Sequence, residues 1–508
     1  MEEQKMKQHD EAVAAIANKV KSFSSAGTQF RIYHGDTNST RPSTRKAGEV
    51  VDITGLNLII KIDDKNKVAM VESNVNMRDL VDATLKHGLL PQVVPEFPGI
   101  TVGGCYSGTA AESSSFKFGY FDKSLNWAEF ILADGRIVKA SSEENADLFR
   151  GAVGACGTLG IGTLFELKLV TARPFVEVKY LAVHSMTEVL KIVNEHTENL
   201  SFADFVDGIM FSAVNGVMII GTMVDEVKPG ATVTRFTRKQ DPWFFLRAHE
   251  SVAHARDTTC DTCSFTNSRR FWHQTIATDV VPIRDYIFRY DRGAFWMGTY
   301  GRSPSKFNRR TRFLLDPFMR ARAMYKTMRH SGRSQLFIIQ DVALPQESSE
   351  AFFDWSHQNL YIYPIWVCPI KASTDAPLHL ANRPADVDHK VIINLGIWGQ
   401  KTVSWPEMDV HWGPQGFEEV VTDTRAIEAK AKELGGLKWL YAHNHYTEEE
   451  FWSIYDKQQY DELRKKYAAA GLPNLFEKTT SEIMEYIPEK PFWKSIFKTF
   501  LGRDNLLN

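Results

Sequence analysis

Residues 93–121 read VVPEFPGITVGGCYSGTAAESSSFKFGYF, and the fold that we expect is inferred mainly from this stretch. Its five glycines and its run of small residues interrupt an apolar segment. Glycine loses more conformational freedom on folding than other residues, so a glycine cluster indicates a tight turn or a close approach of the backbone to a ligand. Backbone N–H groups without nearby side chains can hold a diphosphate. The stretch therefore predicts an anion-binding loop, and the alternative is a surface loop without a ligand.

Two further segments share this composition. Residues 31–42 (RIYHGDTNSTRP) place hydroxyl and amide side chains around one glycine, and residues 151–163 (GAVGACGTLGIGT) contain five glycines. The spacing of Gly154, Gly157 and Gly160 is GxxGxxG, which argues against the GxGxxG turn of the dinucleotide-binding βαβ unit. Three such loops predict one extended cofactor that several loops contact.

The composition sets limits on the function. The chain has 508 residues and a formal net charge of −2, with 43% hydrophobic and 24% charged residues. These values are typical of a soluble globular protein with more than one core, and they give no overall attraction to nucleic acid. The five cysteines do not suggest a disulfide framework, which indicates a reducing, intracellular setting. The CxxC of Cys260 and Cys263 lacks a second pair nearby, so free thiols are favoured over a zinc site.

No membrane-spanning segment or signal peptide is apparent, because no run approaches the roughly 18 apolar residues of a membrane span. We expect a cytoplasmic or peripherally membrane-associated protein. Residues 488–508 alternate lysines with aromatic side chains, which could lie on an anionic membrane surface or dock on the protein body. Residues 306–333 are also basic and amphipathic, and a solvated face with its apolar side packed inward is favoured for them.

The order of predicted elements indicates an α+β fold. Residues 47–170 are rich in strands and contain a helix that Asn76 caps and Gly88 ends. The composition changes after Pro174, where a second α+β unit begins, and helices predominate near the end of the chain.

The opening stretch resembles the flavin-binding loop of FAD domains of the vanillyl-alcohol-oxidase (PCMH) type, in the version carried by Δ24-sterol reductases. That version reads TVGG followed by GTxxESSSxKxG. The matching residues here are Thr101 to Gly104, Gly108, Thr109, Glu112 to Ser115, Lys117 and Gly119. Further similarity lies in LADG (132–135), CGTLG (156–160), PWFF (242–245) and YPIWVCP (363–369). The resemblance thus covers most of the chain.

The resemblance implies a two-lobed PCMH-type FAD-binding domain over residues 1–174 and an α+β substrate or cap domain over residues 175–430. Residues 431–508 would return to the FAD domain and end in the amphipathic tail. The diphosphate would lie against the loops near Gly35 and Gly103, and the adenine near Gly157. The expected cofactor-binding residues are His34, Gly35, Asp36, Thr37, Asn38, Ser39, Pro98, Thr101, Val102, Gly103, Gly104, Gly108, Thr109, Ser113, Ser114, Gly157, Thr158, Gly160 and Ile161.

The resemblance also implies hydride transfer through flavin N5. In Δ24-sterol reductases, NADPH reduces the flavin, and the reduced flavin adds hydride to a carbon–carbon double bond. We therefore expect an FAD-dependent reductase of a sterol-like or other lipophilic substrate, with NADPH as the electron donor. One alternative is an oxidase or dehydrogenase of the same fold that forms a double bond in a secondary metabolite. Another is a flavin-binding interaction protein without catalysis.

Many relatives of this type hold their flavin covalently, through a histidine in an RGxGHS-type turn. Alignment of HGDTNS by its glycine and serine places Asn38 at that position, and His34 lies four positions upstream. We therefore expect FAD to be bound non-covalently.

Reduction of an isolated alkene also requires a positioned proton donor. The candidates are Glu112, Tyr363, His443 and His445. A spacing of two would place both histidines on one face of a strand. That spacing also suits a metal ion, but no third ligand is apparent, and we expect no bound metal.

Overall fold

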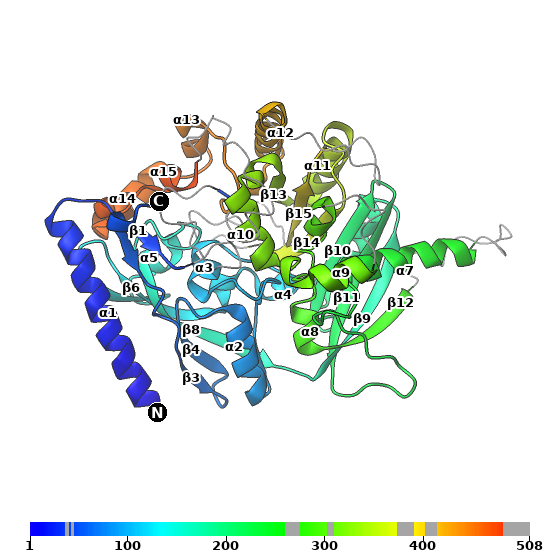
Figure 1. The fold of residues 1–508 in the computed structure, drawn as a ribbon, viewed down its shortest axis with the longest axis horizontal. Coiled ribbons are helices and arrows are strands. Elements are labelled where there is room, and N and C mark those ends of the chain that lie inside the picture. The colour runs from blue at the N-terminus through cyan, green and yellow to red at the C-terminus, as the bar shows by residue number, and fades with distance from the viewer. Residues whose placement is uncertain are drawn as a thin grey trace.

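The computed structural model describes residues 1–35, 40–41, 45–259, 275–301, 309–372, 391–401 and 414–480. These residues form two main sheets with their own helices, and the two units lie side by side (Figure 1). The fold is α+β, as the sequence predicts.

The first sheet has six strands and is built by the N-terminal third of the chain. Its order is β3-β4-β8-β6-β7, and β5 pairs with β8. The strands are β3 (Ile59–Asp63), β4 (Val68–Glu72), β5 (Leu89–Pro91), β6 (Leu125–Ile131), β7 (Ile137–Ser141) and β8 (Ile161–Thr171), and β1 (Arg31–Tyr33) and β2 (Val50–Asp52) form a separate parallel pair.

Four short helices connect these strands: α2 (Met77–Thr84), α3 (Val102–Ser107), α4 (Ser115–Phe118) and α5 (Ala146–Gly151). Helix α2 begins at the predicted cap, because the Asn76 side chain accepts a hydrogen bond from the Asp79 N–H at 3.0 Å. The helical segment ends at Gly88, whose φ of 66° favours glycine.

The second sheet is antiparallel, has eight strands, and runs in the order β12-β9-β11-β10-β14-β15-β13-β16. Its strands are β9 (Phe175–Val183), β10 (Phe205–Ser212), β11 (Asn215–Val224), β12 (Thr275–Pro282), β13 (Ile338–Pro345), β14 (Ile365–Lys371), β15 (Val391–Gly399) and β16 (Leu437–Lys438). We call this sheet with its helices the cap domain.

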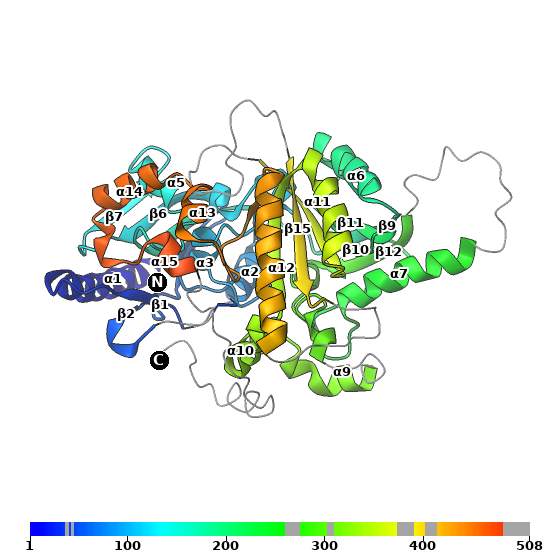
Figure 2. The same cartoon turned by 90° about the horizontal axis from the view of Figure 1, so that it is seen from above.

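The two faces of the cap sheet pack against different partners. One face packs against α6 (Met186–Glu198), α11 (Gln346–Asn359) and α12 (Pro414–Glu433), which lie along it in Figure 2, and forms a core of its own. The other face, together with α7 (Phe244–Thr259), shares a continuous core with the first domain. The Val206 N–H donates to the Ser113 carbonyl oxygen at 2.8 Å across this interface. The glycine-rich stretch thus lies between the two domains.

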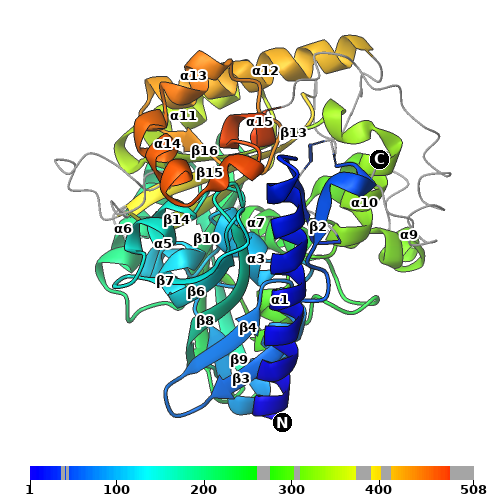
Figure 3. The ribbon, with the colours of Figure 1, turned by 90° about the vertical axis from the view of Figure 1, so that its left-hand side faces the viewer.

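The C-terminal residues return to the first domain. Helices α13 (Glu448–Trp452), α14 (Lys457–Lys466) and α15 (Leu475–Thr479) lie beside it (Figure 3). The Tyr460 hydroxyl donates to Thr158 Oγ1 at 2.8 Å, and the Phe30 N–H donates to the Gly471 carbonyl oxygen at 2.9 Å. Strand β16, by contrast, belongs to the cap sheet.

The remaining sequence predictions concern the C-terminal tail, the cysteine pair, membrane spans and the basic stretch. The lysine–aromatic tail and the cysteine pair Cys260 and Cys263 lie outside the described residues. Among the helices of the described ranges, none combines the length and the apolar character needed to cross a membrane. In the basic stretch, α10 (Ala321–Ser331) packs inward through Ala321 and Tyr325, as the favoured interpretation expects. Helix α9 (Arg309–Leu315), by contrast, has no buried residue and exposes Phe313 and Leu314, so that interpretation does not hold for α9.

The N-terminal helix α1 (Glu2–Ser25) lies along the first domain (Figure 3) and is held there by a buried histidine. His9 Nδ1 lies 2.7 Å from Glu72 Oε1, and His9 Nε2 lies 3.1 Å from Glu129 Oε1. Burial opposes a positive charge on His9, but the hydrogen bonds to Glu129 and Glu72 outweigh it and raise the pKa to about 9.

This contact predicts a pH-dependent contribution to stability. The folded-state pKa of His9 lies above its ordinary value of 6.5. Its stabilisation is therefore complete below pH 6.5 and is lost as the pH rises through about 9. We expect His9→Gln to lower the unfolding midpoint in urea most at low pH, with a difference from wild type that shrinks across this window. A His87→Gln control, which removes an exposed histidine–aspartate pair, should show a much smaller difference, and a pH-independent His9→Gln effect would refute this assignment.

Candidate functional site

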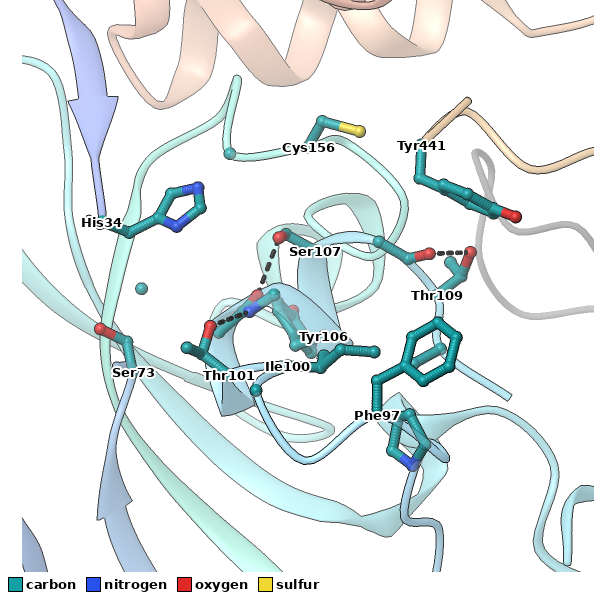
Figure 4. A pocket seen from close by; sticks show the side chains of 18 of the residues that line it. His34, Ser73, Phe97, Ile100, Thr101, Tyr106, Ser107, Thr109, Cys156 and Tyr441 are labelled. Carbon is teal, nitrogen blue, oxygen red and sulfur yellow. Dashed lines mark hydrogen bonds between the residues drawn. The ribbon is translucent and has the colours of Figure 1, made fainter. Parts of the chain in front are cut away.

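A cavity of about 930 Å³ lies between the two domains and is lined by residues of both. Its size is within the range of about 300–1,000 Å³ that is usual for small-molecule sites. Figure 4 shows part of the lining, with His34 and Tyr441 on opposite sides and the loop from Phe97 to Thr109 between them. All three predicted glycine-rich segments contribute to it.

Helix α3 packs closely against the end of β4. The N–H groups of Val102 and Gly103 donate to the carbonyl oxygens of Val75 and Ser73 at 2.9 and 2.8 Å. A Cβ at Gly103 would lie 3.0 Å from Ser73 Cβ. The sequence predicts that the amides of this loop face a diphosphate, but these two amides are already bonded within the protein. The glycine at 103 instead permits close packing of helix on strand.

Other groups along the cavity suit an anionic dinucleotide. The N–H groups of Gly35 and Gly157, at φ values of 82° and 72°, donate to no acceptor among the described residues. The lining also includes five cationic side chains, of which Arg31, Arg41, Arg45 and Lys478 belong to the first domain and the C-terminal segment and Arg322 to α10. Burial, followed by the charge of Arg45, lowers the pKa of Lys478 to about 7. A bound diphosphate would favour the charged form of Lys478, so these residues fit such a ligand.

Most of the predicted cofactor-binding residues with known positions line the cavity. They are His34, Gly35, Thr101, Gly103, Gly104, Gly108, Thr109, Gly157, Gly160 and Ile161. Pro98, Val102, Ser113, Ser114 and Thr158 do not line it, and residues 36–39 lie outside the described residues. Val102 belongs to the core, and the hydroxyls of Ser113 and Ser114 donate to Glu112 Oε2 and to the Gln92 carbonyl oxygen.

None of the predicted proton donors lines the cavity. The Glu112 carboxylate accepts hydrogen bonds from the N–H groups of Ser113 and Ser114 at 2.6 and 2.9 Å, which fixes a turn. The Tyr363 hydroxyl lies 3.2 Å from His357 Nδ1 and packs in the core on the far side of the cap sheet.

The two histidines are also poor proton donors in this environment. Burial, followed by the charge of neighbouring groups, lowers the pKa of His443 to about 3. Burial lowers the pKa of His445 to about 4. Both imidazoles are therefore neutral near pH 7 and have no proton of suitable acidity to give.

The structure instead brings a different acidic group to the cavity. Asp341 of β13, Asn394 of β15 and Tyr441 after β16 all line it. Asp341 Oδ2 accepts from the Tyr441 hydroxyl at 2.6 Å, and Asp341 Oδ1 accepts from Asn394 Nδ2 at 3.0 Å. Burial raises the pKa of Asp341 to about 6. A signal was present in the sequence, since Asp341 is the one charged residue in the largely apolar run IIQDVALP and Asn394 is the one polar residue in VIINLGIWG.

Beside this group, the wall of the cavity is aromatic. The ring centroid of Phe295 lies 4.4 Å from Trp398 and 5.4 Å from Trp366. Trp439 also lines the cavity, and its Nε1 donates to the Thr109 carbonyl oxygen at 2.9 Å. Flat apolar surfaces of this kind can hold an aromatic ring system or a lipophilic substrate.

Comparison with known proteins gives one match within the first domain and others along most of the chain. An FAD binding domain matches residues 10–141. The Delta(24)-sterol reductase of Macaca fascicularis is 26% identical over 484 residues, which cover 92% of this chain and 86% of that protein. The Delta(24)-sterol reductase of Arabidopsis thaliana is 25% identical over 448 residues, 83% of this chain and 74% of that protein. Cytokinin dehydrogenase 9 of rice (Oryza sativa subsp. japonica) is 27% identical over 143 residues, only 28% of this chain and 27% of that protein.

The domain match and the cavity define the chain as a flavoprotein, an oxidoreductase with an FAD-binding domain of the PCMH type. Along most of its length it resembles the Δ24-sterol reductases of animals and plants. The resemblance that the loop motifs predict is therefore confirmed.

Proposed function

We propose that the protein uses FAD and NADPH to reduce a carbon–carbon double bond in a sterol-like or other lipophilic substrate. The observation that carries this proposal is the position of the aromatic wall. It faces the same cavity as the glycine loops, and a buried acid and a tyrosine stand beside it. The similarity to Δ24-sterol reductases over 92% of the chain supports the same reaction class.

Bound FAD supplies hydride transfer through its N5 atom. Arg31, Arg41, Arg45 and Lys478, with the amides of Gly35 and Gly157, would hold the dinucleotide. The aromatic side chains Phe295, Trp366 and Trp398 would exclude water and orient a flat apolar substrate. A dry site strengthens the electrostatic interactions within it.

The proposal also includes the mode of flavin binding and the direction of the reaction. FAD is held non-covalently, so denaturation should release it intact. The sterol-reductase direction is favoured over an oxidase, because the match to the cytokinin dehydrogenase covers 28% of this chain whereas the sterol reductases match across both domains.

An anaerobic titration tests the proposed direction. NADPH should bleach the flavin absorbance of the holoprotein, and a sterol with a side-chain double bond should restore it. The saturated sterol should not restore it. If NADPH leaves the flavin oxidised while a lipophilic substrate bleaches it, the oxidase alternative replaces the proposal. If neither a nicotinamide nor any lipid changes the flavin, the protein is a flavin-binding protein without this catalysis.

A further inference from the structure

Reduction of an unpolarised alkene requires a proton at one carbon as well as hydride at the other. We infer that the Tyr441 hydroxyl donates this proton and that Asp341 resupplies it. This inference rests on the proposed function and names the residues that would complete its chemistry.

The position of Tyr441 carries the inference. Its side chain is only half-buried, lines the cavity, and lies in the wall that also contains Trp398 and Phe295. Its hydroxyl lies 2.6 Å from Asp341 Oδ2, a heavy-atom distance that allows the shared proton to move in either direction. Asp341 itself is buried, with 7% of its surface exposed, and so reaches the cavity mainly through the tyrosine.

The orientation of Asp341 is fixed from the opposite side. Asn394 Nδ2 donates to Asp341 Oδ1 at 3.0 Å. A Cβ at Gly396, on the same strand as Asn394, would lie 2.9 Å from Asp341 Oδ1, so only glycine allows the strand to approach the carboxyl this closely. Oδ2 therefore points to Tyr441, and Asn394 acts as a positioning residue.

The proton balance is closed by these two residues and solvent. As hydride adds to one alkene carbon, the Tyr441 O–H bond breaks and its proton forms a C–H bond at the adjacent carbon. The Asp341 carboxylic acid passes its proton to the tyrosine oxygen, and the carboxylate is reprotonated from solvent. The two electrons come from NADPH through FAD.

The protonated form of Asp341 is the active one in this scheme. The titratable groups facing it are Tyr441, Tyr325 of α10 and Cys368 of β14, and the nearby Asn394 and Trp398 of β15 do not titrate. Burial places the pKa of Asp341 at about 6. The rate of alkene reduction should therefore fall as the pH rises through about 6.

One rival group lines the same cavity. Glu96 is buried, and within the described part of the chain its Oε1 atom has no hydrogen-bond partner. Burial and the charge of Glu112 raise its pKa well above the ordinary value, so it could also carry a proton. Asp341 is bonded to the cavity-lining hydroxyl of Tyr441, and no such hydroxyl is bonded to Glu96 among the described residues, so we assign the donor role to Tyr441.

The test is stopped-flow reoxidation of the NADPH-reduced holoprotein by the alkene. Tyr441→Phe should slow this step by about 10²–10⁴-fold, the usual contribution of a positioned acid, while reduction by NADPH changes less than about threefold. Asp341→Asn should slow reoxidation and remove its pH dependence. The matched control is Tyr467→Phe, which removes a tyrosine–aspartate hydrogen bond of the same 2.6 Å length outside the cavity; its reoxidation should equal that of wild type.

A second readout does not depend on activity. In flavin-free protein, tryptophan fluorescence should titrate with an apparent pKa of about 6 through Trp398, which lies beside Asp341, and Asp341→Asn should abolish this transition. Normal reoxidation in Tyr441→Phe, or a loss of the step in Glu96→Gln alone, would overturn the inference and leave the proposed function intact. If no alkene reoxidises the flavin of the wild-type protein, both the inference and the proposed function are overturned.

Discussion

Gly104→Val is expected to fold normally and to purify without flavin. Gly104 is exposed and lines the cavity, and a Cβ there would meet only Thr101 Oγ1, at 3.1 Å. The added methyl groups would therefore enter the space of the cofactor while the packing of α3 is retained. Displacement of two charge-assisted hydrogen bonds, at about 1.5–3 kcal/mol each, corresponds to an FAD affinity at least about 100-fold lower.

The control for this variant is Gly48→Val, because a Cβ at Gly48 would have no heavy atom within 4 Å. Fluorescence titration with FAD gives the affinities, and the circular dichroism melting curve reports folding. A yellow Gly104→Val protein with the affinity of wild type would remove the cofactor from this part of the cavity.

Arg289→Met is expected to lower the free energy of unfolding by about 3–5 kcal/mol, the usual cost of leaving one charge of a buried pair without its partner. Arg289 Nη2 lies 3.1 Å from Asp207 Oδ2, and neither side chain is exposed. Asp207 Oδ2 also accepts from Trp366 Nε1 at 3.1 Å, and Arg289 Nη2 donates to Ser113 Oγ at 3.3 Å. The pair thus joins the glycine-rich stretch to the aromatic wall of the cavity.

Arg173→Met is the matched control for this prediction. It removes a pair with Asp225 of similar length, 3.0 Å, whose side chains are 52% and 70% exposed. Exposed pairs contribute about 0–1 kcal/mol. Urea unfolding of both variants gives the comparison, and an Arg289→Met midpoint equal to that of Arg173→Met would show that the buried pair contributes no more to stability than the exposed one.

The glycine-rich lining of the cavity could be predicted from the sequence because its signal is local. Thr101, Gly104 and Thr109 lie within one short segment, and their residue types follow from backbone requirements. The same local reasoning assigned a free amide to Gly103. It could not show that Ser73, which directly follows β4 and lies 30 residues earlier in the chain, supplies the carbonyl oxygen that accepts from this amide.

The grouping of Asp341 with its partners could not be predicted by such local reasoning, although the isolated polar residues were visible in the sequence. Asp341, Asn394 and Tyr441 come from three segments that only the pairing of β13 with β15 and β16 brings together. In YAHNHY we expected the histidines to donate protons because of their chemistry, but burial makes His443 and His445 weak bases. Tyr441, two residues before His443, lines the cavity, and neither histidine does.

We expect the cavity between the two domains to bind FAD, and the flavin content of the purified wild-type protein is the decisive measurement. Denaturation should release FAD in an amount equimolar with the chain, and the flavin-free protein should take FAD up again. Protein that purifies without flavin and fails to bind added FAD in a titration would contradict the account.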